Sequence, residues 1–431
     1  MSGLVRLQPA SRVRGRVTVP GDKSISHRAL VLAAIAEGTS TIAGRAAGED
    51  QDSMVACLRA LGVSVDDSAG ETSVSGVGLR GLTSPGAALD CGNSGATMRF
   101  LMGLLSGIPG IEATLVGDGS LSRRPMARVS DPLRRMGAEV ATSPAGMPPV
   151  TVRGVQLQGA DHHLSVSSAQ VKTAILLAGL NAEGQTFIVG RDTGRDHTER
   201  MLRRLGVDIE TGDAIRLRPP TSLPAFRLAV PGDPSSSAFW LTLAIAHPDA
   251  EVTVTGVDVN PTRMGFLEVL RRMGAAVEIG AETDAGGEPA ATITARSSTL
   301  HGTVVEPQEV SAMVDEVPIL AVAAAVAEGT TVFRGLAELR LKETDRVEAV
   351  ATELRRMGAQ VRTEGDDLLV TGGRLHGAEV DSHGDHRMAM SLSVAAALAV
   401  GETELSGAAA AGVSYPDFFE TLAELAGTAV S

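Results

Sequence analysis

The sequence predicts an α/β (α+β) protein with two globular domains, each assembled from three repeated units. Two repeating signatures predict this fold class. The first is an arginine-rich helix end, a glycine and a strand, and it starts at residues 58, 133, 202, 270 and 354. The second is an alanine- and leucine-rich helix, a turn and an alternating strand, with turns near residues 38, 110, 184, 250, 329 and 401. Units spaced by 66 to 79 residues are too short to be separate domains, so we expect two domains of three units.

The composition excludes several classes of protein. Hydrophobic residues make up 43% of the 431 residues, but no apolar run reaches the ~18 residues of a membrane-spanning helix. The N-terminus also lacks the apolar core of a signal peptide. A net charge of −13 and an aromatic content of 2% argue against nucleic acid and anionic membranes as partners. Cys57 and Cys91 have no CxxC spacing, which predicts neither a disulfide scaffold nor a zinc site and favours the reducing cytoplasm.

The four-residue element Val-Pro-Gly-Asp occurs twice, at residues 19–22 and 230–233. Each copy follows a strand pattern and precedes a serine-rich turn and an apolar run. The offset of 211 residues is close to three repeats, so we expect the chain to cross between domains near residues 20–24 and 230–235. The first strand then belongs with the C-terminal half. The predicted domains are residues 21–234 and residues 1–20 with 235–431, with the active site in the cleft between them.

Only the first copy of this element carries cations. Lys23 and Arg28 lie at the start of the expected helix, whereas the second copy has Pro234 and Phe239 at these places. Free N–H groups at the start of a helix attract anions, so the two cations predict a phosphate or carboxylate site. The glycine and serines alone are explained by a turn and a helix cap. The spacing does not fit a Walker A loop.

Two further motifs bring arginines to expected helix starts. GNSGATMRF allows close backbone approach at Gly95 and adds Arg99 one turn into a helix. A plain loop explains Asn93 equally well. SRRP offers Arg123 and Arg124 before a proline suited to a first helical turn. We interpret Arg123 as a solvated surface residue and not as a ligand contact.

Two motifs in the middle of the chain are weaker signals. VSSAQVK begins a helix at which Ser168 and Gln170 serve either as caps or as ligand contacts. Lys172 is interpreted as a structural residue. GRDHTER is charged and loop-like, so Arg195 in it is explained first as part of a solvated helix start.

The acidic residues that most clearly suggest a function are Asp315 and Glu316, which lie side by side at the edge of a long apolar helix. Carboxylates entering an apolar environment have raised pKa values unless they are paired, which suits acid–base catalysis. Stabilisation of the helix dipole is the alternative explanation. Lys342 and Arg346 are four residues apart, so we expect them on one face of a helix. Like charges there disfavour an isolated helix, and a shared anion would explain them.

The motif GDHRMAM places Asp385, His386 and Arg387 directly before an alanine- and methionine-rich helix. Each basic motif therefore lies at the N-terminal side of a helix. If the three units of each domain pack their helices alike, several positive helix ends point toward one cleft. Such an arrangement would let a protein with a net charge of −13 bind polyanionic substrates.

Taken together, the motifs PGDKSISHRALVLAA, GNSGATMRF, SRRP, SSAQVK, DEVPILA, LKETDR and GDHRMAM resemble the 5-enolpyruvylshikimate-3-phosphate synthase family. They occur in this order from residue 19 to residue 390, and SYPDFF at 414–419 extends the match. The resemblance implies two domains of three βαβαββ-type units joined by two crossings. It also implies transfer of the enolpyruvyl group of phosphoenolpyruvate to the 5-hydroxyl of shikimate 3-phosphate by addition–elimination, with release of phosphate. This step belongs to the shikimate pathway of aromatic amino acid biosynthesis.

The resemblance implies no metal and no other cofactor, and we expect a cytoplasmic monomer without nucleic-acid or membrane partners. Asp315 is expected to be the base for the 5-hydroxyl, and Glu343 the acid for the methylene carbon, supported by His386. Lys23 would assist proton transfer and the leaving phosphate. The residues expected to bind shikimate 3-phosphate are Lys23, Ser24, Arg28, Ser168, Gln170, Asp315 and Lys342. Those expected to bind phosphoenolpyruvate are Lys23, Gly95, Arg124, Gln170, Arg346 and Arg387, with Asn93, Arg99 and Arg195 as additional candidates.

The chain departs from the family pattern at three positions. Val413 stands where some members carry a lysine, which removes one contact to phosphoenolpyruvate. Gly194 stands where some members carry a serine, for which Arg195 could substitute. Ala96 stands where some members have threonine, which leaves sensitivity to glyphosate open.

Two alternatives remain at the level of the sequence. One is enolpyruvyl transfer to a UDP-sugar, whose enzymes typically carry a reactive cysteine in the loop that reads GDGSLSRRP here. The other is a non-catalytic repeat protein that binds anions. It explains the repeats and the arginines, but not the paired Asp315 and Glu316.

Overall fold

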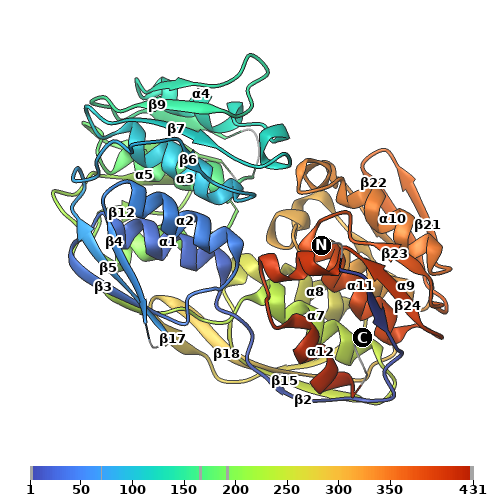
Figure 1. Cartoon of the computed structure of the whole chain (residues 1–431). Coiled ribbons are helices and arrows are strands. Elements are labelled where there is room, and N and C mark those ends of the chain that lie inside the picture. Colours follow the sequence, from blue (N-terminus) through green and yellow to red (C-terminus); the bar gives the residue numbers. More distant parts are fainter. Residues whose placement is uncertain (1–2, 69, 165–166, 191–193, 428–431) are drawn as a thin grey trace. The chain divides into compact units, whose positions relative to one another are not determined.

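The computed structural model of the protein describes residues 3–68, 70–164, 167–190 and 194–427. It divides the chain into two compact units (Figure 1). Unit 1 comprises Met1–Pro20, Pro231–Thr283 and Pro289–Ser431, and unit 2 comprises Gly21–Val230 and Asp284–Glu288. Residues 231–234 thus lie in unit 1, and Asp284–Glu288 in unit 2, which differs from the bounds expected from the sequence. The hairpin tip 284–288 is held in unit 2 by Glu288, whose Oε1 lies 2.8 Å from His197 Nδ1.

Unit 2 contains three four-stranded sheets among the described residues, and all three have the same strand order. The first is β14 (Arg227–Ala229), β3 (Glu37–Ala43), β5 (Glu71–Val77) and β4 (Ser64–Ser68). The second is β6 (Leu89–Asp90), β7 (Glu112–Val116), β9 (Val150–Arg153) and β8 (Glu139–Ala141). The third is β10 (Asp161–His163), β11 (Thr186–Val189), β13 (Ala214–Leu217) and β12 (Ile209–Glu210). In each sheet the first pair is parallel and the others are antiparallel.

Unit 1 repeats this arrangement in the part of the chain that the structure describes. One sheet is β2 (Val13–Val17), β15 (Ala250–Asp258), β18 (Glu288–Arg296) and β16 (Ala276–Ile279), with β17 (Thr283–Ala285) paired to β18. The next is β19 (Val304–Val305), β20 (Thr330–Phe333), β22 (Asp367–Thr371) and β21 (Gln360–Glu364). The last is β1 (Val5–Leu7), β24 (Thr403–Ser406) and β23 (Glu379–Asp381). The predicted α/β (α+β) class with threefold repetition is confirmed.

The strand before each Val-Pro-Gly-Asp copy pairs with the strand that follows the other copy. β2 precedes the first copy and runs parallel to β15, whereas β14 precedes the second copy and runs parallel to β3. Each parallel pair therefore joins segments from distant parts of the sequence. These two pairs fix the chain where it passes between the units, at residues 20–21 and 230–231.

The first helix of each repeat is buried on almost every side. These helices are α1 (Lys23–Ala34), α3 (Gly95–Ser106) and α5 (Ala169–Gly179) in unit 2, and α7 (Pro234–Ala246), α9 (Val317–Ala325) and α11 (His386–Leu398) in unit 1. Their alanine- and leucine-rich sequences predict such burial. α3 and α5 approach closely at Gly103, where a Cβ would lie 2.1 Å from the Ala174 carbonyl oxygen. Each unit has its own hydrophobic core around these helices.

The second helix of five of the six repeats is amphipathic and ends in the arginine-rich signature. These helices are α2 (Glu49–Ala60), α4 (Ala127–Arg135), α6 (His197–Arg204), α8 (Gly265–Arg272) and α10 (Arg346–Arg356), and α12 (Phe418–Ala426) lies near the C-terminus. The glycine after each signature has a positive φ, as expected of a left-handed helix end: Gly62, Gly137, Gly206, Gly274 and Gly358. The signature arginine also holds the next strand, since Arg59, Arg134 and Arg355 donate to the carbonyl oxygen six residues later.

Short 3-10 helices complete the architecture: η1 (Leu121–Arg123), η2 (Pro261–Arg263), η3 (Pro307–Ala312), η4 (Ala337–Leu341) and η5 (Ala408–Val413). Among the helices of the described residues, none combines the length and apolarity needed to cross a membrane.

Candidate active site

Unit 2 carries a first set of candidate site residues, which begins at the start of α1. Asp22 caps this helix by accepting a hydrogen bond from the Ile25 N–H at 2.8 Å. Lys23, the first helical residue, places its Nζ 3.0 Å from Asp50 Oδ2. The Lys23 side chain is 23% exposed, so a ligand anion can compete with Asp50 for it. Asp50 was not foreseen, because it lies on α2 and no local pattern links it to Lys23.

Arg28 lies deeper and joins α1 to neighbouring helices. Its Nε donates to Thr198 Oγ1 at 2.7 Å, and its Nη2 to Thr173 Oγ1 at 2.8 Å. Its Nη1 donates to the Ser24 carbonyl oxygen at 2.8 Å, while Ser24 Oγ accepts from Arg195 Nη1 at 3.3 Å. Burial lowers the pKa of the Arg28 guanidinium to about 10. The side chain therefore anchors the helix, and its contact with shikimate 3-phosphate stays a prediction.

Arg124 and Asn93 form a polar cluster beside the start of α3. Arg124 Nη2 donates to Asn93 Oδ1 at 2.6 Å, and Nη1 donates to the Asn93 carbonyl oxygen at 3.3 Å. A Cβ on Gly95 would lie 2.8 Å from Arg99 Nη1 and 3.5 Å from Arg124 Nη1. The glycine therefore leaves room beside two guanidinium groups. Arg123 is exposed, in keeping with its interpretation as a solvated residue.

The start of α5 adds two more predicted residues to the set in unit 2. Ser168 caps the helix by accepting a backbone N–H at 3.5 Å. Gln170 accepts a hydrogen bond from Arg99 Nη1. Lys172 is fully buried and its Nζ lies 2.5 Å from Glu199 Oε1. Burial lowers the pKa of Lys172, although Glu199 opposes this shift, so the position of Lys172 suits a structural residue.

Unit 1 carries a second set of candidate site residues, which converges on Asp315. Its Oδ1 lies 3.3 Å from Arg346 Nη1 and 3.6 Å from Lys342 Nζ, and its Oδ2 lies 3.8 Å from Arg387 Nη2. The prediction that Lys342 and Arg346 lie on one face of a helix is wrong. Asp345 caps α10 by accepting the first backbone N–H groups, so Lys342 stays outside the helix. The two cations share the Asp315 carboxylate instead.

Arg346 is the central cation of this cluster and is only 1% exposed. Its Nη2 donates to Glu343 Oε2 at 2.7 Å, and its Nε donates to Asp385 Oδ2 at 2.8 Å. Burial acts to lower the pKa of Arg346, but the carboxylates of Asp385, Glu343 and Asp315 outweigh it and raise the pKa. One permanent cation thus holds the two candidate catalytic carboxylates on different nitrogens.

Asp385 is a second residue of these clusters, after Asp50, whose role was not foreseen. It caps α11 by accepting the Arg387 N–H at 2.8 Å, and it is fully buried against Arg346. Aspartate directly before a helix is a recognisable cap signal, and that signal could have found it. His386 and Arg387, the first two residues of α11, are also buried. The support of Glu343 by His386 stays a prediction.

One group in unit 2 has the residue types of a metal site: Asp196, His197 and Glu288. The Arg200 guanidinium already pairs with both carboxylates of this group, since its Nε lies 2.8 Å from Asp196 Oδ2 and 3.6 Å from Glu288 Oε2. His197 Nδ1 lies 2.8 Å from Glu288 Oε1. The group is thus an ion-pair network that fixes the hairpin tip.

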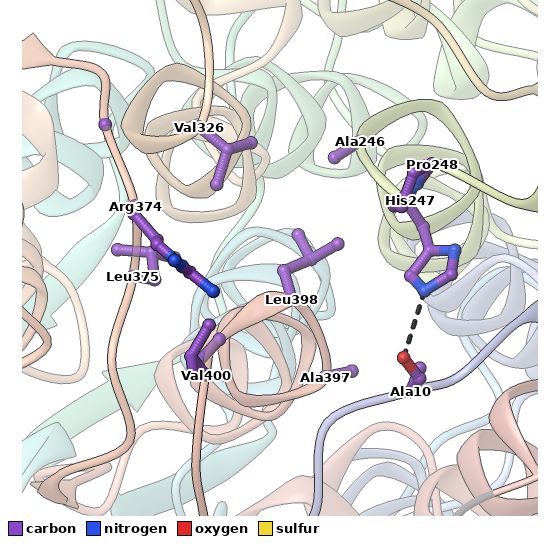
Figure 2. Close-up of a pocket in the computed structure, with 12 residues that line it drawn as sticks. Ala10, Ala246, His247, Pro248, Val326, Arg374, Leu375, Ala397, Leu398 and Val400 are labelled. Atoms are coloured by element: carbon purple, nitrogen blue, oxygen red, sulfur yellow. Dashed lines mark hydrogen bonds between the residues drawn. The ribbon is translucent and has the colours of Figure 1, made fainter.

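A hollow of about 300 Å³ lies within unit 1 where the buried helices α7, α9 and α11 end. Figure 2 shows Arg374 and Leu398 on its walls, and a hydrogen bond between His247 and Ala10. This bond joins His247 Nε2 to the Ala10 carbonyl oxygen over 3.1 Å. Its lining contains none of the predicted site residues. The cation–carboxylate cluster lies at the starts of α9 and α11, so the hollow is at the other end of the same helices.

His27, one turn into α1, is expected to make the stability of unit 2 depend on pH. Burial lowers its pKa from 6.5 to about 4. Below pH 6.5 the His27 imidazole binds a proton in the unfolded chain but stays neutral in the folded chain. The free energy of unfolding therefore decreases as the pH drops toward 4. Between pH 7.5 and 5 this costs about 2 kcal/mol.

Urea unfolding followed by circular dichroism at the two pH values checks this expectation. The difference should shrink by about 2 kcal/mol in His27→Gln. It should stay at the wild-type value in His301→Gln, the same exchange at an exposed histidine. An unchanged pH difference in His27→Gln would contradict the assignment.

Comparisons with known proteins identify the family of the chain. The family model of EPSP synthase (3-phosphoshikimate 1-carboxyvinyltransferase) matches residues 7–422. A 3-phosphoshikimate 1-carboxyvinyltransferase of Roseiflexus sp. (strain RS-1) is 48% identical over 97% of this chain and 98% of its own length. One of Synechococcus sp. (strain RCC307) is 49% identical over 98% and 99%.

Solved structures extend the comparison to three dimensions. The EPSP synthase of Acinetobacter baumannii superimposes with a TM-score of 0.88 at 41% identity, over the full length of both chains. The enolpyruvyl transferase NikO of Streptomyces tendae, at 22% identity and a TM-score of 0.81, shares the fold. The chain is a member of the EPSP synthase family, the transferases that move the enolpyruvyl group of phosphoenolpyruvate to shikimate 3-phosphate.

Proposed function

We propose that this chain performs its family's reaction with Asp315 as base and Glu343 as acid. The observation that carries this proposal is the sharing of Arg346 by the two carboxylates, with contacts of 3.3 Å to Asp315 and 2.7 Å to Glu343. Addition of an alcohol to an enol ether carbon requires one group that removes a proton and another that supplies one. Two carboxylates held on separate nitrogens of one guanidinium meet this requirement.

The addition step has a balanced set of proton transfers. Asp315 takes the proton of the 5-hydroxyl while the hydroxyl oxygen bonds to the central carbon of phosphoenolpyruvate. Glu343 protonates the methylene carbon. In the elimination step Glu343 takes a proton back from the new methyl group, and the carbon–oxygen bond to phosphate breaks. The departing phosphate takes up the proton that Asp315 removed, and Lys23 assists this proton transfer and the leaving phosphate. An anion bound to Arg346 would compete with Glu343 for the guanidinium, which makes it easier for Glu343 to carry a proton.

The remaining predicted residues are proposed to bind the two substrates. Lys23, Ser24, Arg28, Ser168, Gln170, Asp315 and Lys342 form the shikimate 3-phosphate set. Lys23, Gly95, Arg124, Gln170, Arg346 and Arg387 form the phosphoenolpyruvate set, with Asn93, Arg99 and Arg195 in support. The partners seen in unit 2 support these sets: Arg124 is held by Asn93, and Gln170 by Arg99.

We propose further that the candidate residues of unit 1 and those of unit 2 form two half-sites that act on one pair of substrates. We also propose that the protein works as a monomer in the cytoplasm. Each unit buries its own core, which favours independent folding units without a second chain. Cys57 and Cys91 are free and buried, which suits a reducing compartment.

Phosphate release tests the proposed function. The native chain is mixed with phosphoenolpyruvate and either shikimate 3-phosphate or a UDP-sugar as acceptor. Release is expected only with shikimate 3-phosphate, because the reactive cysteine of the UDP-sugar enzymes has no counterpart in the loop at residues 117–125. Release with the UDP-sugar alone would overturn the assignment, and no release with either acceptor would favour an anion-binding repeat protein.

A further inference from the structure

The hollow at the C-terminal ends of α7, α9 and α11 is lined by residues of unit 1 alone. Its volume of about 300 Å³ lies at the lower end of the ~300–1,000 Å³ of small-molecule sites. Figure 2 shows the Arg374 side chain reaching into it beside Leu398 and Val400. Apart from His247, every other side chain of the lining is apolar. The hollow thus combines apolar walls with one guanidinium group.

The helix ends around the hollow already have hydrogen-bond partners. At the end of α11 the Ala397 carbonyl oxygen accepts the Ala10 N–H at 2.9 Å. At the end of α9 the Ala325 carbonyl oxygen accepts the Gly373 N–H, also at 2.9 Å. Arg374 is exposed and makes no hydrogen bond or ion pair with any residue that the structure describes. A cation near helix C-termini complements their dipoles, but these carbonyl groups are bonded without it.

Unit 2 contains an equivalent junction, which can be aligned with this one residue by residue. Gln158 and Glu183 form a parallel bridge in unit 2, and His376 and Val400 form the corresponding bridge in unit 1. Each bridge joins the segment after the last strand of the second repeat, β9 or β22, to the turn after the buried helix of the third repeat, α5 or α11. Differences between the two junctions therefore reflect side chains on a shared backbone arrangement.

The junction in unit 2 is closed by side chains that bond to one another. Gln156 and Asn181 correspond to Arg374 and Leu398 of unit 1, because each lies two residues before a residue of its bridge. Gln156 Nε2 donates to the Asn181 carbonyl oxygen at 3.1 Å. Arg80 donates to Gln156 Oε1 at 3.3 Å and to Asn181 Oδ1 at 3.5 Å. Unit 1 has a leucine and an unpaired cation in place of these two amides.

The chemistry of the hollow selects one class of ligand. A guanidinium presents a planar fork of donors that matches the two oxygens of a carboxylate. Val326, Leu398 and Val400 offer apolar surface to the remainder of such a ligand. A ligand rich in hydroxyl or phosphate groups would leave polar atoms unpaired against these walls.

We propose that the hollow is a binding site for a small carboxylic acid with a compact apolar body, and that Arg374 binds its carboxylate. The departure of unit 1 from unit 2 supports this assignment, because Leu398 removes the amide that would otherwise close the junction. None of the residues proposed for catalysis or substrate binding lines the hollow. The proposal therefore goes beyond the proposed function and does not depend on it.

A ligand-observed NMR titration of the native chain with 3-phenylpropanoate tests the proposal. The uncharged 3-phenylpropan-1-ol is the comparison probe, since it keeps the apolar body and lacks the carboxylate. We expect saturable binding of the carboxylate with a Kd of about 1 mM or lower. The alcohol should bind at least ~10-fold more weakly, because it loses a charge-assisted hydrogen bond.

Arg374→Gln should weaken binding of 3-phenylpropanoate at least ~10-fold. Arg362→Gln is the matched control, because Arg362 is an exposed arginine of β21 that also has no side-chain partner among the described residues. It should bind like wild type. Arg374→Gln combined with Leu398→Asn rebuilds the amide pair of unit 2 and should also lose binding. If this double variant does not fold, Arg374→Gln decides alone.

The titration is repeated with saturating shikimate 3-phosphate and phosphoenolpyruvate, because the cations of the candidate site also attract carboxylates. Unchanged binding of 3-phenylpropanoate supports the hollow as its site. Displacement by the substrates would place the probe in the candidate site and overturn the proposal. The absence of binding to the native chain up to about 10 mM, or equal binding by Arg374→Gln and wild type, would also overturn it. Arg374 would then serve only to complement the helix ends.

Discussion

Glu343→Gln is expected to lower kcat at least ~100-fold, the usual loss when a general acid is removed. Glutamine keeps the size of the side chain and can still accept the hydrogen bond that Arg346 Nη2 donates at 2.7 Å. It cannot deliver a proton to carbon. KM for both substrates should therefore change little, and a phosphate-release assay at saturating substrates measures the loss.

Glu268→Gln is the matched control, because Glu268 forms the same i,i+3 pair with Arg271 on the exposed face of α8. It should turn over like wild type. Near-normal kcat in Glu343→Gln would show that another group supplies the proton, and Asp315 would be the first to examine.

Arg346→Leu is expected to cost about 3–5 kcal/mol in the free energy of unfolding of unit 1. The substitution leaves the carboxylates of Asp385, Glu343 and Asp315 without the cation that they share. Breaking a buried ion pair by removing one partner is strongly destabilising, because the other charge stays in the low-dielectric interior. Fluorescence of Trp240, the single tryptophan of the chain and a buried residue of unit 1, follows this transition in urea.

Arg340→Leu provides the comparison for this loss. Arg340 contacts Asp345 at 2.7 Å and Asp366 at 3.0 Å, but both carboxylates are well exposed. Exposed pairs contribute ~0–1 kcal/mol, so Arg340→Leu should cost at most that much. Equal losses in Arg340→Leu and Arg346→Leu would mean that the carboxylates around Arg346 are solvated rather than buried.

The parts of the fold that the sequence predicts are those with local causes. The helix ends before Gly62 and Gly137 could be placed because a glycine with positive φ terminates a helix within its own turn. The burial of α7 and α9 follows from their apolarity in every direction. The repeats then predict that one arrangement of strands and helices recurs along the chain, because each repeat must bury an equivalent face.

The pairings inside the candidate site could not be derived in this way. Asp50 meets Lys23, and Asp385 meets Arg346, only after helices from different parts of a unit have packed. The error at Lys342 had a local cause, since Asp345 before Arg346 is a cap signal that marks the true start of α10. The motifs identified the candidate cations and the two candidate catalytic carboxylates, whereas the partner of each charge was set by tertiary contacts.

The proposal that substrates draw the two half-sites together is tested most directly by X-ray scattering in solution. Lys23 and Arg124 lie on unit 2, and Arg346 and Arg387 on unit 1, so anions that contact both sets would favour a closed form. The radius of gyration should be smaller with shikimate 3-phosphate and glyphosate, or phosphoenolpyruvate, than without ligand. The change should be weaker in Lys23→Ala, whereas Pro234→Ala should leave the ligand contacts unchanged. Identical scattering curves with and without saturating ligands would contradict closure as the way the active site is assembled.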